Sequence, residues 1–352
     1  MRAKILSLAM FCTMTIATGI VAGFAMGIIA GCRSDSSSAT PKPAVVVLYT
    51  SVDEPFAREV VAEFEKTSGI KVNMVNDTEA SKTAGLARRI RAERNRPQCD
   101  VLWQNDLFST IRLAREGIFE EYRPPAEGIP DRYKDPNGQW VAFSPRARVL
   151  MWNTTRVQRN EVPTKWHDIA DPKWKGKLVI SNPQFGTATA HFAAMLALWG
   201  EPAYVAWLQQ LNDTLNGELQ DGNSTVARRV GTGEKALGAV DTDDVFARQL
   251  RKEPVEMLYP DLGDGGTLLN PNSVALIKNA PHPDAARVLI DFLTSETTER
   301  LLARSESRNF PVRESLQREL NMPPPPETKL SFDKIADVLE QSTQLASQYL
   351  VH

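Results

Sequence analysis

Three aspartates occur within four residues of the chain: Asp241, Asp243 and Asp244, with Thr242 among them. The apolar run 236–240 before them predicts a buried strand, which places the cluster at the carboxyl end of that strand. Carboxylate oxygens suit Mg²⁺, Ca²⁺, Mn²⁺ or Fe³⁺, and they also accept hydrogen bonds from sugar hydroxyls or an ammonium group. Aspartate is equally favoured at helix N-caps and in solvated loops. The cluster therefore predicts either a ligand site, with Asp243 and Asp244 as candidate metal ligands, or a helix cap.

A second candidate site has the opposite charge preference. Gly186, Thr187 and Ala188 open a long apolar helix predicted to run to residue 199. Backbone N–H groups at a helix start favour anions, and small residues let a ligand approach closely. Capping of the helix by Thr187 is the alternative. A zwitterion, a phosphorylated polyol, or a metal with a carrier anion would satisfy both this helix start and the aspartate cluster.

Two arginines alternate along one predicted strand. An arginine that faces a cleft can hold an anionic group bidentately, and if one of Arg146 and Arg148 faces it we expect the other to point away. Further candidate ligand contacts lie where predicted strands end, and Trp103 among them has core packing as its alternative role. These candidates are Thr50, Ser51, Glu79, Ser81, Trp103 and Asn105.

Alternating strand and helix patterns must position these residues. Strands are predicted at 44–49, 70–75 and 100–103, with helices at 56–68, 84–94 and 108–116 between and after them. This alternation predicts an α/β fold with a mainly parallel sheet, whose ligands bind at the carboxyl ends of the strands. The segment 140–240 predicts a second α/β domain. Strands at 255–259 and 273–277 are expected to return the chain to the first domain, with helices at 283–295, 297–304 and 332–349.

The N-terminus has the pattern of an export signal. Arg2 and Lys4 precede an uncharged stretch, 5–30, that ends in Ala30-Gly31-Cys32. Such a stretch predicts a secretory signal, and it is also long enough for an uncleaved membrane anchor. Ala-Gly-Cys resembles a bacterial lipoprotein box, in which Cys32 is lipidated. We therefore expect a signal at 1–31, a lipidated flexible tether at 32–43, and a chain anchored on the periplasmic side or outer face of the cell membrane.

Composition argues against several classes of function. The formal net charge is −2 and no basic tract occurs, so nucleic acid is not an expected partner. Beyond the tether the chain keeps one cysteine, Cys99, which excludes an internal disulfide or a thiolate metal cage. No nucleophile and base stand in a recognisable arrangement, so an enzyme is not favoured.

Several short segments, in this order, carry a resemblance to a known family. They are Val47-Leu48-Tyr49, Asp100-Val101-Leu102-Trp103, Ser144-Pro145-Arg146-Ala147-Arg148-Val149, Pro172-Lys173-Trp174-Lys175-Gly176-Lys177, and a C-terminal stretch, 266–293. Each is weak alone, but their order and spacing resemble bacterial extracellular (periplasmic) solute-binding proteins of family 1, the class that includes the ferric-iron-binding proteins of ABC transporters. The likeness covers residues 45–312.

The resemblance implies a two-lobed periplasmic-binding-protein fold of type II, with a ligand cleft between lobes joined by crossing strands. The expected divisions are 44–143 for the first part of lobe 1, 144–258 for lobe 2, and 259–352 for the return to lobe 1 and the C-terminal helices. It implies a monomer that delivers its ligand to the permease subunits of an ABC-type importer. It implies no catalysis and no cofactor, with Fe³⁺ as the ligand typical of the family.

The ligand site is where this chain departs from the family pattern. Asp243 and Asp244 stand at the positions where ferric binders of this type have a pair of tyrosines. Asp53 and Asn105 stand where some relatives have a histidine and a glutamate, whereas Arg146 is kept. The phenolate iron site is therefore not carried over. An organic solute, such as a phosphorylated sugar or a phosphonate, and a role as a ligand-presenting sensor remain alternatives.

Overall fold

The computed structural model describes residues 44–77 and 84–350. The predicted signal, the tether with Cys32, and the candidates Glu79 and Ser81 lie outside the described residues. The described residues all belong to one unit that begins at residue 43. Within this part of the chain, no helix is both long and apolar enough to cross a membrane.

The first lobe is built on three parallel strands, as predicted. β1 pairs with β2 on one side and β3 on the other. α1 packs its buried residues Val60, Val61 and Phe64 inward and ends at Gly69, which adopts the left-handed conformation with φ of 70°. The elements are β1 (Val45–Thr50), α1 (Glu54–Ser68), β2 (Lys71–Asn76), α2 (Ala84–Glu93), β3 (Val101–Gln104) and α3 (Leu107–Arg115).

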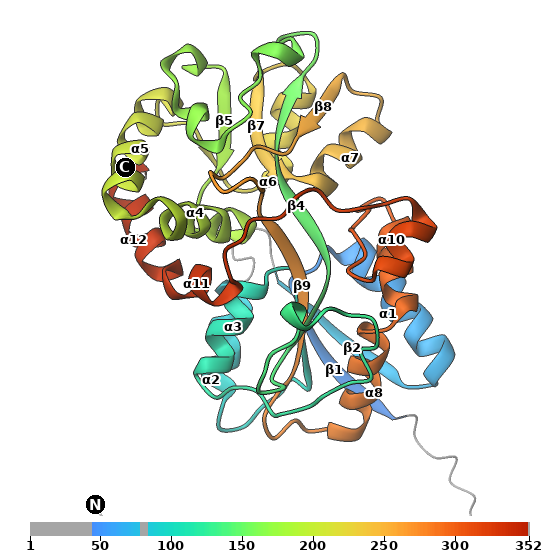
Figure 1. Ribbon diagram of the computed structural model, residues 1–352. Coiled ribbons are helices and arrows are strands. Elements are labelled where there is room, and N and C mark those ends of the chain that lie inside the picture. Colours follow the sequence, from blue (N-terminus) through green and yellow to red (C-terminus); the bar gives the residue numbers. More distant parts are fainter. Residues whose placement is uncertain (1–43, 78–83, 351–352) are drawn as a thin grey trace, which may run out of the picture. The chain divides into compact units, whose positions relative to one another are not determined.

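Two long buried strands carry the chain between the lobes. β4 (Val141–Asn153) is one continuous strand that is buried along its whole length. Its first part pairs with β9 (Leu269–Leu276), which in turn pairs with β3. Its second part pairs with strands of the second lobe. An irregularity in the pairing lies between Phe143 and Arg146, where Ser144 has a φ of 43°. Figure 1 shows both strands running through the middle of the fold.

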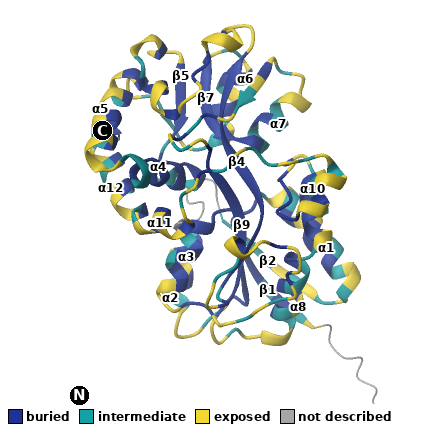
Figure 2. Cartoon of the chain, viewed as in Figure 1, coloured by how far each residue is buried: buried dark blue, intermediate teal, exposed yellow. Residues whose placement is uncertain are grey.

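The second lobe continues the same sheet, in the order β9-β4-β7-β5-β6. β5 is parallel to β6 and β7, whereas β7 and β8 are antiparallel to β4. The helices cover this sheet, and their outer faces are exposed while the strands β4, β5 and β7 are buried (Figure 2). The elements are β5 (Leu178–Ser181), α4 (Gly186–Trp199), α5 (Glu201–Leu215), β6 (Leu219–Gln220), α6 (Asn223–Gly231), β7 (Leu237–Asp241), α7 (Thr242–Leu250) and β8 (Val255–Leu258).

One strand does not follow the expected path. β8 was expected to return the chain to the first domain, but it pairs with the segment Leu150 to Asn153 of β4 in the second lobe. The connection from α7 is only four residues long, which keeps β8 beside that lobe. The return to the first lobe is instead made by β9.

After β9, the described C-terminal part consists of helices joined by loops. The predicted helix 332–349 is in fact two helices, separated at Val338. α8 packs on β1 and β9 in the first lobe, whereas α12 packs on α4 and α5 in the second. The helices are α8 (Pro283–Leu293), α9 (Glu296–Arg304), α10 (Glu314–Leu320), α11 (Phe332–Asp337) and α12 (Leu339–Leu350), and short 3-10 turns occur at Asp131–Tyr133, Arg159–Glu161, Trp166–Ala170 and Pro172–Trp174.

Candidate functional site

A polar pocket lies where strands of both lobes end and helices begin. β1, β3, β5 and β7 all point their carboxyl ends toward it, which is where an α/β sheet is expected to bind its ligand. Asp53 and Asn105 come from the first lobe, and Arg146 comes from the crossing strand β4. The lining residues are Asp53, Asn105, Arg146, Ser181, Phe185, Gly186, Thr187, Asp221, Gly222, Asn223, Ser224, Asp241, Asp243 and Asp244.

The Asp241 side chain forms hydrogen bonds with several elements at the base of the pocket. It ends β7, caps the start of α7, and is almost fully buried. Its carboxylate accepts hydrogen bonds from Arg148 Nη1 at 2.9 Å, Thr187 Oγ1 at 2.6 Å and Asn223 Nδ2 at 3.3 Å. Thr187 and Asn223 stand at the starts of α4 and α6. Asp241 therefore fixes the N-terminal ends of three helices against β4.

The charge of Asp241 is held by the arginines around it. Burial acts to raise the pKa of this carboxyl, but Arg148 and Arg146 outweigh burial and keep the pKa below its usual value. Arg148 is itself buried, and Asp241 is its ion-pair partner. Arg148 and Asp241 thus form a buried ion pair beneath the pocket.

Asp243 and Asp244 lie beside Asp241 at the start of α7. One oxygen from each of the three carboxylates lies within 4.8 Å of the others, a spacing that can hold a metal ion. Asp244 Oδ2 also accepts a hydrogen bond from the backbone N–H of Asp241 at 3.1 Å, which completes a capping box. The helix-cap interpretation therefore holds for Asp241 and Asp244, without excluding a ligand. Burial, followed by repulsion from Asp243 and Asp241, raises the pKa of Asp244 well above its usual value.

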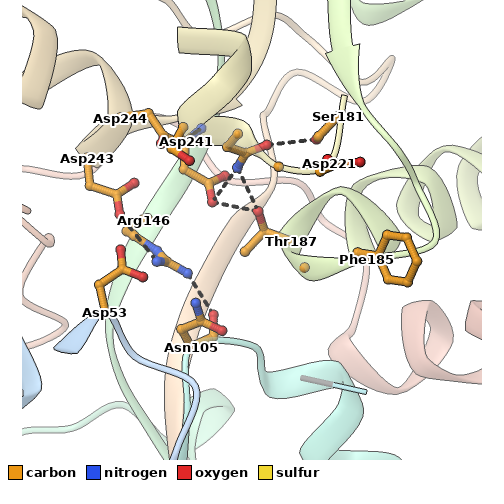
Figure 3. Close-up of a pocket in the computed structure, with 14 residues that line it drawn as sticks. Asp53, Asn105, Arg146, Ser181, Phe185, Thr187, Asp221, Asp241, Asp243 and Asp244 are labelled. Carbon is orange, nitrogen blue, oxygen red and sulfur yellow. Dashed lines mark hydrogen bonds and ion pairs between the residues drawn. The ribbon is translucent and has the colours of Figure 1, made fainter. Parts of the chain in front are cut away.

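Arg146 connects the two walls of the pocket. Its Nη1 donates to Asp243 Oδ2 at 3.3 Å in the second lobe, and its Nη2 donates to the backbone oxygen of Asn105 at 2.8 Å in the first. In Figure 3 its guanidinium lies between Asp243 on one side and Asp53 and Asn105 on the other. Burial acts to lower the pKa of Arg146, but the surrounding aspartates raise it above its usual value.

The expected opposition of Arg146 and Arg148 is wrong. Both side chains reach the aspartate cluster, Arg146 through Asp243 and Arg148 through Asp241. Residues two positions apart in a strand lie on the same face, so the two arginines share the side on which α7 begins.

Seven of the predicted candidates line the pocket, and five described ones do not. Those that line it are Asn105, Arg146, Gly186, Thr187, Asp241, Asp243 and Asp244. Trp103 is fully buried and packs near Phe143, with ring centroids 6.3 Å apart, so core packing is its role. Ala188 is the third residue of α4 and is buried.

The other three act behind the pocket wall. Thr50 Oγ1 accepts a hydrogen bond from the backbone N–H of Val52, and Thr242 Oγ1 accepts one from that of Ala147. Ser51 Oγ donates to Asn105 Oδ1 at 3.0 Å and accepts from the Asn105 backbone N–H at 3.1 Å. Ser51 therefore orients a lining residue without reaching the pocket itself.

Sequence reasoning missed six lining residues around β5 and β6. They are Ser181, Phe185, Asp221, Gly222, Asn223 and Ser224. Ser181 ends β5 and could have been found by the rule that identified Asn105, which follows β3. The stretch 221–224 follows β6, which has only two residues and leaves no recognisable strand pattern. Asp53 was noted for its position in the family pattern but not assigned to the site.

The pocket is acidic overall. Its lining carries five aspartates and one arginine, so its electrostatic preference is for a cation or for a ligand rich in hydrogen-bond donors. Among the described residues, no tyrosine, histidine, cysteine or glutamate lines it. Any metal held there by described side chains would therefore have oxygen ligands from aspartates.

Comparison with known proteins gives consistent matches. Residues 107–340 match the family model described as bacterial extracellular solute-binding protein. The chain is 28% identical over 314 residues to iron uptake protein A1 of Synechocystis sp., covering 86% of each chain. The crystal structure of iron-bound HitA from Pseudomonas aeruginosa aligns with a TM-score of 0.77 at 22% identity, covering 87% of this chain and 99% of that one.

A second solved structure carries a different ligand. It is the periplasmic binding protein AfuA from Actinobacillus pleuropneumoniae with fructose-6-phosphate bound, and it aligns with a TM-score of 0.74 at 22% identity, covering 88% of this chain and 99% of that one. At such identities a likeness carries the fold and not the ligand, and it confirms the expected two-lobed α/β fold of type II. From the family model and this fold together, the chain belongs to the bacterial extracellular solute-binding proteins.

Proposed function

We propose that this chain is the substrate-binding lipoprotein of an ABC-type importer, and that it captures a hard metal cation, Fe³⁺ or an Fe³⁺ complex, in the acidic pocket between its lobes. The observation that carries the proposal is the spacing of the Asp241, Asp243 and Asp244 carboxylates, within 4.8 Å of one another. The name of the Synechocystis relative, an iron uptake protein, supports the choice of iron.

The ligands differ from those of a tyrosine-based iron site. Asp241 already accepts hydrogen bonds from three side chains, so Asp243 and Asp244 are the metal ligands in this proposal, and Asp53 approaches from the opposite wall. Carboxylate oxygens are hard donors that suit Fe³⁺. Arg146 beside them holds a carrier anion or balances the carboxylates when no metal is bound.

Binding of Fe³⁺ is the direct test. A ligand that binds only the folded chain raises its stability, by about 2.7 kcal/mol at a concentration one hundred times Kd. Thermal-shift titration with ferric nitrilotriacetate should therefore raise the Tm of the wild-type chain and not of the Asp243→Asn/Asp244→Asn double variant. Asp284→Asn is the matched control, because Asp284 is fully exposed on α8, where it pairs with Arg287.

Spectroscopy separates this site from the one expected from the family. Because no tyrosine among the described residues lines the pocket, bound Fe³⁺ should lack the strong visible band of an iron–phenolate bond. Absence of any Tm increase with Fe³⁺ would remove iron as the ligand, and a strong phenolate band would show that Asp243 and Asp244 are not the ligands.

An organic phosphate is the second candidate ligand. The helices α4 and α6 both begin at the pocket, where backbone N–H groups favour an anion. Gly186, the first residue of α4, has a φ of 59°, and its missing side chain leaves space for a ligand. The AfuA structure with fructose-6-phosphate supports this alternative. A Tm increase with fructose-6-phosphate or 2-aminoethylphosphonate, and none with Fe³⁺, would favour it.

Export and anchoring are part of the proposal. Lipidation of Cys32 would hold the chain at the membrane as a monomer, where its two lobes meet the permease subunits. Cys32→Ser should release the chain into the soluble extracellular fraction, and the wild-type chain should carry a diacylglyceryl mass on Cys32. A sensor role is distinguished by deletion of the gene, which in that case would abolish a response to the ligand but leave its uptake intact.

A further inference from the structure

The end of the chain contacts both lobes beside the pocket. In the second lobe, α12 packs along α4 and α5. Tyr204 Oη and Ser342 Oγ share a buried hydrogen bond of 2.9 Å, and Gln184 Nε2 donates to the backbone oxygen of Thr343 at 3.2 Å. In Figure 1, α11 and α12 run along the side of the molecule from α3 to α5. We call residues 326–350 the C-terminal brace.

The same brace is attached to the first lobe through α11. Phe332 is buried there, with its ring centroid 5.9 Å from that of Phe108 and 5.7 Å from that of Tyr133. Arg115 on α3 pairs with Asp333 at 2.9 Å and with Asp337 at 2.7 Å. The brace therefore combines an apolar contact with charge pairs on a single helix of the first lobe.

A second charge pair and a backbone contact extend the attachment. Arg112 on α3 pairs with Glu340, the second residue of α12, at 3.1 Å. Before α11, Thr267 N donates to Pro326 O, and Thr328 N donates to Thr267 O, both at 2.9 Å. A side chain at Gly266 would overlap the backbone of Glu327, so glycine is required for this approach. The brace is thus joined to the loop before the crossing strand β9.

The two helices that the brace joins carry opposite walls of the pocket. α3 follows Asn105 directly, and α4 begins at Gly186 and Thr187. We propose that the C-terminal brace positions α3 relative to α4, and so sets how closely the two walls of the pocket approach around a ligand. The proposal rests on ligand capture between the lobes, and it adds a connection beyond the crossing strands β4 and β9.

The expected effect is moderate. The ion pairs of the brace are partly exposed, and pairs of this kind contribute little individually. Ligand binding requires one arrangement of the two lobes. A variant that makes this arrangement less populated weakens the apparent affinity by the same factor. Removing the three pairs together should therefore weaken ligand binding about three- to tenfold, and should not abolish it.

The test uses the full chain with Arg112→Ala and Arg115→Ala combined. Spin labels at Glu59→Cys on α1 and Glu256→Cys on β8, in a chain with Cys12→Ser and Cys32→Ser, report the distance between the lobes, because both labelled positions are exposed and the remaining native Cys99 is buried. In the ligand-free double variant, the distance distribution should broaden relative to wild type. The Kd for ferric nitrilotriacetate should rise three- to tenfold.

Two controls separate the brace from general effects of losing arginines. Arg58→Ala combined with Arg318→Ala removes two exposed pairs that lie within single helices, and it should change neither readout. A second control reverses the charges of the two Arg115 pairs in the otherwise wild-type chain. Arg115→Glu combined with Asp333→Lys and Asp337→Lys should keep the wild-type distance distribution.

Unchanged distances together with an unchanged Kd, or a tighter Kd in the Arg112→Ala/Arg115→Ala variant, would overturn the proposal. If the wild-type chain does not bind Fe³⁺, the iron proposal fails, while the distances still decide the role of the brace.

Discussion

At the residue scale, Asp241 is important because of the buried arginine with which it pairs. Arg148 is 1% exposed, and its Nη1 donates to Asp241 at 2.9 Å. Removing one member of a buried pair leaves the other charge without compensation, which costs far more than loss of an exposed pair. The carboxylates of the cluster therefore differ in role: Asp241 stabilises the fold, and Asp243 is a residue that our proposal assigns to the ligand.

This division gives a prediction for single substitutions. Asp241→Asn should lower the free energy of unfolding by about 3–5 kcal/mol, because Arg148 is left buried and unpaired. Asp243→Asn should lower it by less than half as much, because Arg146, its ion-pair partner, still has Asp241, Asp53 and Asp244 nearby. Urea denaturation followed by circular dichroism measures both values. Equal losses in the two variants would contradict the division.

The sequence could predict where the carboxylates lie but not how they pair. Asp241 follows an apolar strand, and this alone placed the cluster at the ligand-binding edge of the sheet. Pairing of Arg148 with Asp241 depends on the antiparallel register of β4 and β7, in which these two residues stand opposite each other. No local pattern contains that register, because the two strands are separated by about ninety residues of chain.

At the element scale, the contact between α6 and β7 holds one edge of the pocket. α6 begins at Asn223 and β7 ends at Asp241, and both of these residues line the pocket. Gly238 lets the helix lie directly on the strand. A methyl group added there would stand 2.6 Å from Val226 Cγ1 and 2.9 Å from Val230 Cγ2. The absence of a side chain at this position sets the spacing of the two elements.

Gly238→Ala should therefore destabilise the chain by about 1–3 kcal/mol, the usual cost of overpacking a core. Gly231→Ala is the matched control, because a methyl group on that α6 glycine meets mainly the end of the Glu253 side chain, which can move. Alanine also favours the helix by up to about 1 kcal/mol, so this control should be neutral or stabilising. Thermal unfolding of both variants tests the prediction, and a neutral Gly238→Ala would contradict it.

Most individual elements could be predicted from the sequence, whereas their partners could not. The parallel arrangement of β1, β2 and β3 follows from alternating strands and helices, and the structure confirms it. The pairing of β8 with β4 was missed because a strand of four residues pairs equally well with many neighbours. The break between α11 and α12 was missed because the apolar pattern continues through Val338.

At the scale of the whole molecule, the two lobes are joined by β4, β9 and the C-terminal brace. Glu327 in the brace lies at one of these junctions. Its carboxylate accepts a hydrogen bond from Arg132 Nη2 at 2.8 Å and from Tyr133 Oη at 3.3 Å, both in the first lobe. Burial raises the pKa of Glu327 to about 7, although Arg132 opposes the change. This junction therefore titrates near neutral pH.

The raised pKa predicts how stability depends on pH. Between about pH 4.5 and 7, the native chain holds a proton on Glu327 that the unfolded chain has already released. The stability contributed by this proton is fully present below about pH 4.5, and it is lost as the pH rises through 7. The whole contribution is about 3 kcal/mol at most.

Glu327→Gln should remove this dependence, because glutamine fills the same space and does not titrate. Between pH 4.5 and 7.5, the Tm of the wild-type chain should fall relative to that of the variant, with the steepest change midway between the two pKa values and a levelling above pH 7. Scanning calorimetry at half-unit steps of pH measures the difference in Tm between the two chains. The titration of every other group is common to both chains and cancels in this difference. A constant Tm difference across this range would mean that Glu327 titrates as an ordinary exposed carboxyl, and that burial between the brace and the first lobe does not govern its charge.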